Sequence, residues 1–212
     1  MGIPESEKGR TASERSHRVT LSKPFYMGTY PVTQGEWEAV MGTNPSNFQT
    51  LDDRLPVENV TWDECRECSI KLWELEGKPD VTFRLPTEAE WEYACRAGTT
   101  ASFYFGDALT QKMAATTVGQ LQRTLSVGQF QPNAFGLYDM HGNVFEWCED
   151  WYAGGYPIET NDPTGPGTGC NHVMRGGSWH SPLTSCRSAY RTYTDKGKHS
   201  NVGFRLVLSS RD

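Results

Sequence analysis

Three stretches of this sequence begin with the same pattern, a threonine followed three positions later by a glutamate. The pairs are Thr33/Glu36, Thr61/Glu64 and Thr87/Glu90. In such a capping box the threonine oxygen accepts a hydrogen bond from a free amide of the first helical turn, and the glutamate accepts one from the threonine amide. A glycine, which readily closes a last helical turn in the left-handed conformation, follows each stretch, at Gly42, Gly77 and Gly98. We therefore predict three helices, each running from its threonine to its glycine.

The candidate strands are short and lie between long connections rich in Gly, Pro and Asn. They fall within residues 17–28, 81–86, 136–140, 173–179 and 202–209. Few short strands with long loops predict an α+β fold with small mixed or antiparallel sheets. The 21 glycines and 25 aromatic residues, counting seven Trp, nine Tyr and nine Phe, predict irregular backbone pinned by aromatic side chains. A chain of 212 residues is of single-domain size, so we predict one domain over residues 1–212.

Charge and hydropathy narrow the range of partners. The formal net charge is -6, and no run of Lys and Arg offers a surface for a polyanion. No stretch approaches the roughly 20 apolar residues of a membrane span, and the amino end MGIPESEKGR lacks the apolar run of a signal peptide. We therefore expect no nucleic-acid partner, no membrane span and a cytoplasmic location, unless an export segment precedes this chain.

The six cysteines include one pair with CxxC spacing, Cys65 and Cys68. A zinc site of this kind needs a second CxxC or a nearby pair of histidines, and the sequence contains neither. Both cysteines lie inside the second predicted helix. We therefore predict that their thiols are half-buried packing groups on that helix.

Six blocks of sequence occur in an order that resembles a known family. They are PFYMGTYPVTQGEWEAVMG, LPTEAEWEYACRAGT, PNAFGLYDMHGNVFEWCEDWY, MRGGSW, CRSAYR and GFRLV. These blocks, which extend from about His17 to Leu208, resemble the signatures of the formylglycine-generating enzyme, or sulfatase-modifying factor, family. The resemblance implies an irregular, loop-rich relative of the C-type lectin fold, in agreement with three capped helices and small sheets. Met1-Gly2 resembles the middle of the family's first block, which predicts that the usual leading strand is absent from this chain.

The resemblance also raises the question whether this chain has the copper ligands of the family. In the enzymes of that family, two cysteines between the GGS block and the last arginine-rich block bind copper and convert a substrate cysteine to formylglycine. Here only Cys186 lies in that window. Depending on the register, it corresponds to the second copper cysteine, with Ser181 at the first position, or to neither. Because a cuprous ion is held by paired thiolates, we expect no copper and predict a packed Cys186, with a catalytic Cys186 as the less favoured reading.

Iron has no clear ligands either. A second oxidase branch of the family carries iron on histidines supplied mainly by an additional helical domain, which is absent here. The five histidines are scattered without His-x-x-x-His spacing. Two of them, His141 and His180, lie in signature blocks, and we predict that both are exposed polar loop residues.

The block DMHGNVFEW carries a stronger metal signal. By resemblance, Asp139 and Glu146 supply side-chain oxygens to calcium, and Gly142 and Val144 supply backbone carbonyls. Calcium is a hard cation with six to eight oxygen ligands, and a tight Gly-Asn turn can present carbonyls between two carboxylates. The alternative is that both carboxylates accept hydrogen bonds from turn amides without an ion. We favour calcium, and we expect one ion only, because the family's second calcium site has no match in residues 112–129.

The segment from Trp179 to Lys196 is a mixture of Tyr, Ser, Thr and His, which suits adaptable recognition and is equally compatible with an ordinary polar loop. A similar RGGSW…CR…GFRLV frame occurs in the variable proteins of diversity-generating retroelements, where this segment is the recognition surface. The candidate ligand-binding residues are Trp179, His180, Ser181, Thr184, Ser185, Tyr190, Tyr193 and Thr194.

Two functions of different class remain open. The first, which we favour, is a binding module for a protein or peptide ligand, with the oligomeric state unassigned. The second is an oxygen-dependent oxidoreductase of the formylglycine-generating type, whose metal site is rebuilt from Cys186 with His180 or Ser181.

Overall fold

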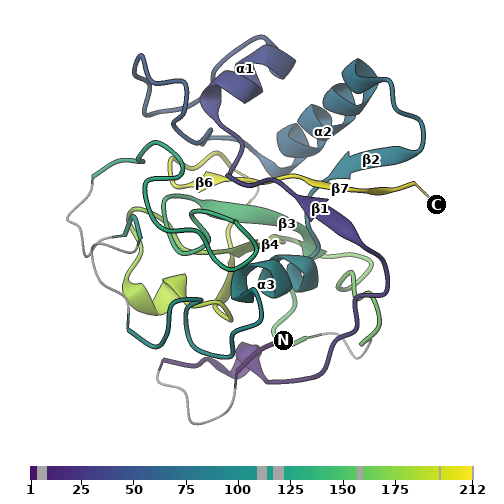
Figure 1. The fold of residues 1–212 in the computed structure, drawn as a ribbon, viewed down its shortest axis with the longest axis vertical. Helices are drawn as coiled ribbons and strands as arrows, with labels where there is room; N and C mark the ends of the chain where they lie inside the picture. Colours follow the sequence, from purple (N-terminus) through teal and green to yellow (C-terminus); the bar gives the residue numbers. More distant parts are fainter. Residues whose placement is uncertain (4–8, 109–113, 117–121, 157–159, 196, 212) are drawn as a thin grey trace.

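The computed structural model describes residues 1–3, 9–108, 114–116, 122–156, 160–195 and 197–211 (Figure 1). Its helices are α1 (Gln34–Met41), α2 (Trp62–Glu76) and α3 (Glu88–Arg96), with 3-10 turns η1 (Ala12–Glu14) and η3 (Leu183–Cys186). Its strands are β1 (Phe25–Met27), β2 (Val81–Arg84), β3 (Phe145–Trp151), β4 (His172–Arg175), β5 (Arg191–Tyr193), β6 (Val202–Gly203) and β7 (Val207–Ser210). None of these helices is long and apolar enough to cross a membrane.

All three predicted helices are present, and each begins with both arms of its capping box. Gly42 and Gly77 close the first two helices in the left-handed region, with φ of 77° and 62°. The third helix ends one residue earlier than predicted, at Ala97 and not at Gly98. Ala97 itself is left-handed, with φ of 45°, because its amide closes the last turn on the Tyr93 carbonyl.

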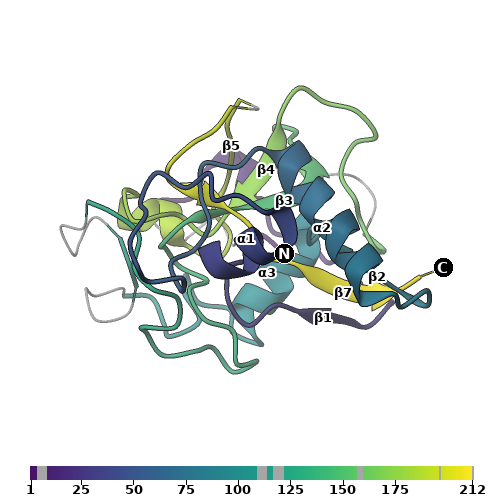
Figure 2. The same ribbon diagram turned by 90° about the horizontal axis from the view of Figure 1, so that it is seen from above.

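Two small sheets form the framework. The first is antiparallel with strand order β1-β7-β2, and the second has the order β5-β4-β3-β6, in which β3 and β6 are parallel. The predicted combination of small antiparallel and mixed sheets is therefore confirmed. Only residues 204–206 separate β6 from β7, so the last part of the chain links the two sheets. In Figure 1, α1 and α2 lie on one side of these strands and α3 lies on the other, and Figure 2 shows the same arrangement from above.

Four of the five predicted strand regions contain strands, and one does not. Residues 136–140 form no strand, because Asp139 adopts a left-handed conformation, with φ of 58°, that interrupts extended pairing. Strand β3, the longest described strand, was not predicted. It is buried on both faces along most of its length, so its sequence FEWCEDW lacks alternation, and its acidic residues Glu146 and Asp150 are buried.

Aromatic side chains fill the space between helices and sheets. In the first core cluster, Trp37 and Trp62 from the helices meet Trp147 and Phe204 from the strand side. The rings of Trp37 and Phe204 pack edge to face with centroids 5.8 Å apart. A second cluster surrounds Trp91 of α3. The indole N–H groups of Trp62 and Trp147 donate to backbone carbonyls, so these rings satisfy the irregular backbone as well as fill the core.

Buried arginine–glutamate pairs join elements that are far apart in sequence. Arg175 on β4 donates to Glu92 on α3, and neither side chain is more than 1% exposed. The same guanidinium donates to the carbonyls of residues 188–190. Arg205 forms two hydrogen bonds with the carboxylate of Glu146 at 2.9 and 2.8 Å. The carboxy-terminal loops are therefore held to α3 and β3 by buried charge pairs.

Two further pairs hold the outer segments. Arg191 on β5 forms two hydrogen bonds with Glu88 on α3, at 2.7 and 2.6 Å. Arg187 forms two with Glu14 of the amino-terminal turn η1, at 2.7 and 2.9 Å. All four side chains are nearly inaccessible to solvent. These pairs fix both ends of the segment 187–191 against the rest of the molecule.

We predict that Glu92→Gln lowers the free energy of unfolding by about 3–5 kcal/mol, because the buried Arg175 guanidinium then loses the nearer of its two carboxylate partners and keeps only Glu88, at 3.5 Å. Urea unfolding followed by tryptophan fluorescence measures this loss. The matched control is Glu67→Gln, which breaks the exposed Glu67–Lys71 pair and should cost less than about 1 kcal/mol. Equally small losses in both variants would contradict a structural role for the buried pair.

Candidate functional site

Trp179 is the centre of a set of contacts that joins separate surface segments. It is partly buried, its amide donates to the Asn143 carbonyl at 2.9 Å, and its indole N–H donates to the Ser200 carbonyl at 3.1 Å. The Phe48 ring packs edge to face against it with centroids 5.3 Å apart, and the His180 ring lies 5.1 Å away. Trp179 therefore fixes the loop that carries Phe48 and the segment around Ser200 in one place.

The loop after β5 is linked to these contacts through His199. Thr194 Oγ1 lies 3.1 Å from His199 Nε2, and His199 directly precedes Ser200. Tyr193, which directly precedes Thr194, is 49% exposed, and its ring lies 4.4 Å from that of Tyr152. We give one name, the recognition face, to the residues Phe48, Trp179, His180, Tyr193, Thr194 and His199.

Two of the predicted ligand-binding residues are not free surface groups. Ser181 is buried, and its Oγ accepts a hydrogen bond from the Ser178 amide at 3.0 Å, so its hydroxyl is engaged within the turn and its role in ligand binding stays a prediction. Tyr190 is partly buried because its ring packs against the first core cluster. The hydroxyl of Ser181 stabilises the turn after the GGS block, and the ring of Tyr190 packs in the core.

Thr184 and Ser185 lie on the turn η3, which packs against the amino-terminal segment. A Cβ at Gly9 would lie 3.4 Å from Thr184 Cγ2. The Arg187 guanidinium donates to the Thr184 carbonyl and to Glu14, which fixes this turn against residues 9–14. Thr184 is exposed and Ser185 half-buried, and residue 196 of the predicted segment lies outside the described residues.

Cys186 occupies the packed position that the sequence predicts. Its side chain is fully buried in a cluster with Phe103 and Ala114, and its Sγ lies 3.7 Å from the Pro182 carbonyl. Burial raises the pKa of the thiol to about 12, so the thiol stays protonated at neutral pH. A two-thiolate copper site does not fit these residues, because Cys186 is the only cysteine between Trp179 and the end of the chain.

His141 differs from its prediction as an exposed loop residue. It is buried because the rings of Phe103, Tyr104 and Phe105 surround it. The Tyr104 amide donates to Nε2 at 3.1 Å, so Nδ1 carries the proton and donates to the Cys186 carbonyl at 2.7 Å. Burial lowers the pKa of His141 to about 3 and keeps the ring neutral. His180 is exposed, as predicted.

The CxxC pair is more deeply buried than predicted. Cys65 and Cys68 lie on the core side of α2, because both belong to the first core cluster. Burial raises the pKa of Cys68 to about 12. In the part of the chain that the structure describes, no group of three or more His, Cys, Asp or Glu side chains could hold a metal ion. A metal site there needs other ligands besides these side chains, such as backbone carbonyls.

The turn predicted to bind calcium combines positive φ angles with buried carboxylates. Asp139 and Gly142 have positive φ angles of 58° and 130°. A Cβ at Gly142 would lie 2.3 Å from the Ala115 carbonyl, so only glycine fits there. Asp139 accepts a hydrogen bond from the Gly128 amide at 2.7 Å. Burial raises the pKa of Asp139 to about 6, and the charge of Glu146 adds to the shift.

Glu146 already has close partners. Its carboxylate accepts hydrogen bonds from the Trp91 indole at 2.7 Å and from Arg205 at 2.9 and 2.8 Å. A carboxylate has about four acceptor sites, so one is left for a cation. Two carboxylates and one guanidinium leave the turn with one uncompensated negative charge, and the donors fit a hard cation. Of the second window, residues 112–129, only 114–116 and 122–129 are described.

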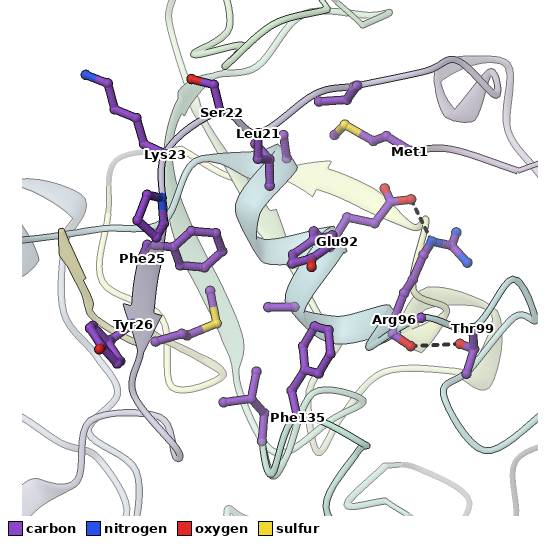
Figure 3. Close-up of a pocket in the computed structure, with 18 residues that line it drawn as sticks. Met1, Leu21, Ser22, Lys23, Phe25, Tyr26, Glu92, Arg96, Thr99 and Phe135 are labelled. Atoms are coloured by element: carbon purple, nitrogen blue, oxygen red, sulfur yellow. Dashed lines mark hydrogen bonds and ion pairs between the residues drawn. The ribbon is translucent and has the colours of Figure 1, made fainter.

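A groove of about 900 Å³ lies apart from the recognition face, between β1 and α3 (Figure 3). Its walls carry the exposed rings of Tyr26, Tyr93 and Phe135. The charged groups Glu92 and Arg96 at its side are bound to each other at 2.9 Å. None of the predicted ligand-binding residues lines this groove.

The sequence analysis missed Phe48 and His199 of the recognition face, and it missed the neighbouring Glu58. Phe48 lies in the connection TNPSNFQTLDDRLP, which has no periodicity. Glu58 is fully buried, and its Oε1 accepts a hydrogen bond from the Phe48 amide at 2.8 Å. The sequence indicates the burial of Glu58 through its position as the only charged residue in the mainly apolar run LPVENV.

Comparison with known proteins identifies relatives over most of the chain. The model of the family described as the sulfatase-modifying factor enzyme 1-like domain matches residues 2–210. A Chlamydia pneumoniae protein named serine/threonine-protein kinase pkn1 is 42% identical, over 96% of this chain and 36% of that protein. The formylglycine-generating enzyme of Mus musculus is 32% identical, over 90% of this chain and 53% of the enzyme. This chain therefore spans about a third to a half of the length of these two relatives.

A solved structure shows the same fold. Treponema denticola variable protein 1 has a TM-score of 0.86 and 29% identity, over 99% of this chain and 91% of that one. This similarity confirms the irregular, C-type-lectin-like α+β fold that the sequence blocks imply. Since the family model covers nearly the whole chain and a formylglycine-generating enzyme is 32% identical over most of it, the chain belongs to the family of sulfatase-modifying factor enzyme 1-like domains.

Proposed function

We propose that this domain is a recognition module that binds a protein or peptide ligand through the recognition face. The observation that carries the proposal is the state of Cys186, whose buried, protonated thiol supplies no nucleophile to the surface. The groups that the surface does offer are the imidazole of His180 and the exposed ring of Tyr193. Such groups bind through contact area and adaptable hydrogen bonds.

The way the face is held supports this proposal. Tyr193 lies on β5, which Arg191 fixes to Glu88 of α3 through two buried hydrogen bonds. Trp179 is fixed by two hydrogen bonds to backbone carbonyls and by the Phe48 ring. A pre-organised surface loses little conformational entropy on binding, which favours affinity. The likeness to a protein named as a variable protein also favours recognition as the role of this surface.

We predict that peptides selected from a displayed random library against this domain at pH 6.5 bind the recognition face. The double variant His180→Ala/Tyr193→Ala of the domain should bind the selected peptides at least about 30-fold more weakly, which corresponds to the loss of a hot spot of about 2 kcal/mol. Isothermal titration calorimetry measures the change. The control is Tyr26→Ala, which removes an exposed tyrosine from the other sheet and should leave affinity unchanged. Peptides that lose affinity only with Tyr26→Ala would place recognition elsewhere.

The second candidate function is an oxygen-dependent oxidoreductase with an altered metal site. The observation in its favour is the identity of 32% with a formylglycine-generating enzyme over most of the chain. Such a site would have to use Cys186 with the exposed His180, because Ser181 is buried and bonded to Ser178. Ionising Cys186 in its present surroundings is unfavourable, and a single thiolate makes a weak cuprous site.

We predict that the reduced domain binds no copper(I) through Cys186 and consumes no oxygen with a cysteine-containing peptide. Competition titration with a chromogenic copper(I) chelator measures binding, and an oxygen electrode measures turnover. Cys186→Ser and Cys170→Ser are compared, because Cys170 is the exposed thiol and reports adventitious binding. Tight binding that disappears only in Cys186→Ser, with oxygen uptake by the wild type, would establish the oxidase instead.

We also propose that the turn at Asp139 binds one calcium ion, which stabilises the domain. We predict that the melting temperature rises in millimolar calcium over a chelator, because ligand at 100 times its dissociation constant stabilises a fold by about 2.7 kcal/mol. Asp139→Asn should abolish the rise, and Asp195→Asn, at an exposed carboxylate, should retain it. Equal melting temperatures with and without calcium in the wild type would exclude the ion.

A further inference from the structure

The loop 44–49 brings Phe48 to the recognition face, and it is pinned mainly by neutral hydrogen bonds. The Gln34 amide donates to the Phe48 carbonyl at 2.9 Å, and the Asn59 side chain donates to the Pro45 carbonyl at 2.8 Å. One ionisable side chain joins these contacts. Glu58 accepts the Phe48 amide at Oε1, and the backbone amide of Glu58 donates to Ser46 Oγ. The position of Phe48 therefore depends directly on the state of Glu58.

The surroundings of Glu58 are unusual for a glutamate. Its side chain is completely buried, and its second oxygen, Oε2, has no hydrogen-bond partner among the described residues. Burial raises the pKa of Glu58 to about 7, while the amides of Phe48 and Asn47 oppose the shift. No charged group contributes to this shift. Burial of a carboxylate with one unsatisfied oxygen and no neighbouring cation favours its protonated form.

The ionisable groups on the neighbouring elements have other partners. On α1, Glu36 accepts the Thr33 amide in its capping box. On the segment that precedes Ser200, Lys198 pairs with Glu64, and His199 contacts Thr194 and Asp195. None of these groups supplies a counter-charge to Glu58: Glu36, Glu64, Asp195, Lys198 and His199.

We infer that Glu58 is a proton-controlled latch of the recognition face, which holds Phe48 against Trp179 while neutral and releases loop 44–49 when it ionises. The inference rests on the proposed function in one respect, that this face is where ligand binds. The cheapest way to hydrate an ionised Glu58 is to open this loop, because its residues Asn47 and Gln49 are already exposed. Opening removes the edge-to-face contact of Phe48 with Trp179.

The direction of the pH effect follows from the raised pKa. The closed loop is fully stabilised below about pH 4.5, and this stabilisation is lost as the pH rises through about 7. A ligand that packs on Phe48 and Trp179 therefore binds more tightly on the acid side. Above pH 7, its affinity falls by up to about tenfold for each pH unit, since one proton is coupled to closure.

Nuclear magnetic resonance of the free domain tests the latch without any ligand. Between pH 5.5 and 8.5, we predict that the amide shifts of Asn47 and Phe48 titrate with a midpoint near 7, together with the side-chain carboxyl carbon of Glu58. Glu58→Gln should keep the amides at their low-pH positions throughout. Asp150→Asn is the control and should leave the titration of the Asn47 and Phe48 amides unchanged. Burial also raises the pKa of Asp150, to about 8, but its carboxylate binds the Glu88 amide on α3.

The outcomes separate the latch from the proposed function. A Glu58 carboxyl midpoint below 5.5 in the wild type overturns the latch, even if Glu58→Gln does not fold. An amide midpoint near 7 that persists in Glu58→Gln overturns it as well. If the free domain titrates as predicted but selected peptides bind equally well at pH 6.5 and 8, the loop is pH-sensitive and its control of the recognition face is wrong.

Discussion

The buried guanidinium of Arg175 is the interaction on which most of the fold depends. This domain has short strands and long connections, so regular hydrogen-bond ladders leave the loops of its carboxy-terminal half without support. Arg175 supplies that support, because it binds Glu92 of α3 and the carbonyls of residues 188–190 at the same time. A planar donor with five N–H groups suits irregular backbone, whose carbonyls point in several directions. The cost is that removing either charge leaves the other one buried.

The same principle explains how the recognition face is kept rigid. Arg191 and Arg187 each bind a glutamate twice, and they lie at the two ends of the segment that leads into β5. Bidentate pairs restrict orientation as well as distance. The residues between these anchors are buried or partly buried, and Tyr193 and Thr194 of the recognition face follow the second anchor closely, so their side chains can differ without loosening the backbone. A surface of this kind is suited to recognition, because its chemistry and its support are carried by different residues.

Local sequence patterns predicted the helices, and non-local burial explains the errors. The capping boxes at Thr33, Thr61 and Thr87 act within one turn, so the sequence alone indicates them. Strand β3 was not predicted because the partners of its buried acidic residues lie far away in the chain, Arg205 for Glu146 and the Glu88 amide for Asp150. The burial of His141 was not predicted for a related reason, since the three aromatic rings of residues 103–105, far away in the chain, enclose it. The family blocks supplied the fold, but they did not indicate Phe48 or Glu58, whose roles depend on a loop without periodicity.

The contrast between Cys186 and Glu58 shows how one framework can serve different functions. Both are fully buried, and in both burial raises the pKa because the charged form loses its hydration. For the thiol, whose usual pKa is already above 7, the shift removes reactivity at physiological pH. For the carboxylic acid, a shift in the same direction brings the pKa to about 7, where small changes of pH matter. Desolvation thus makes the Cys186 thiol unreactive, and it makes Glu58 a group that can respond to pH.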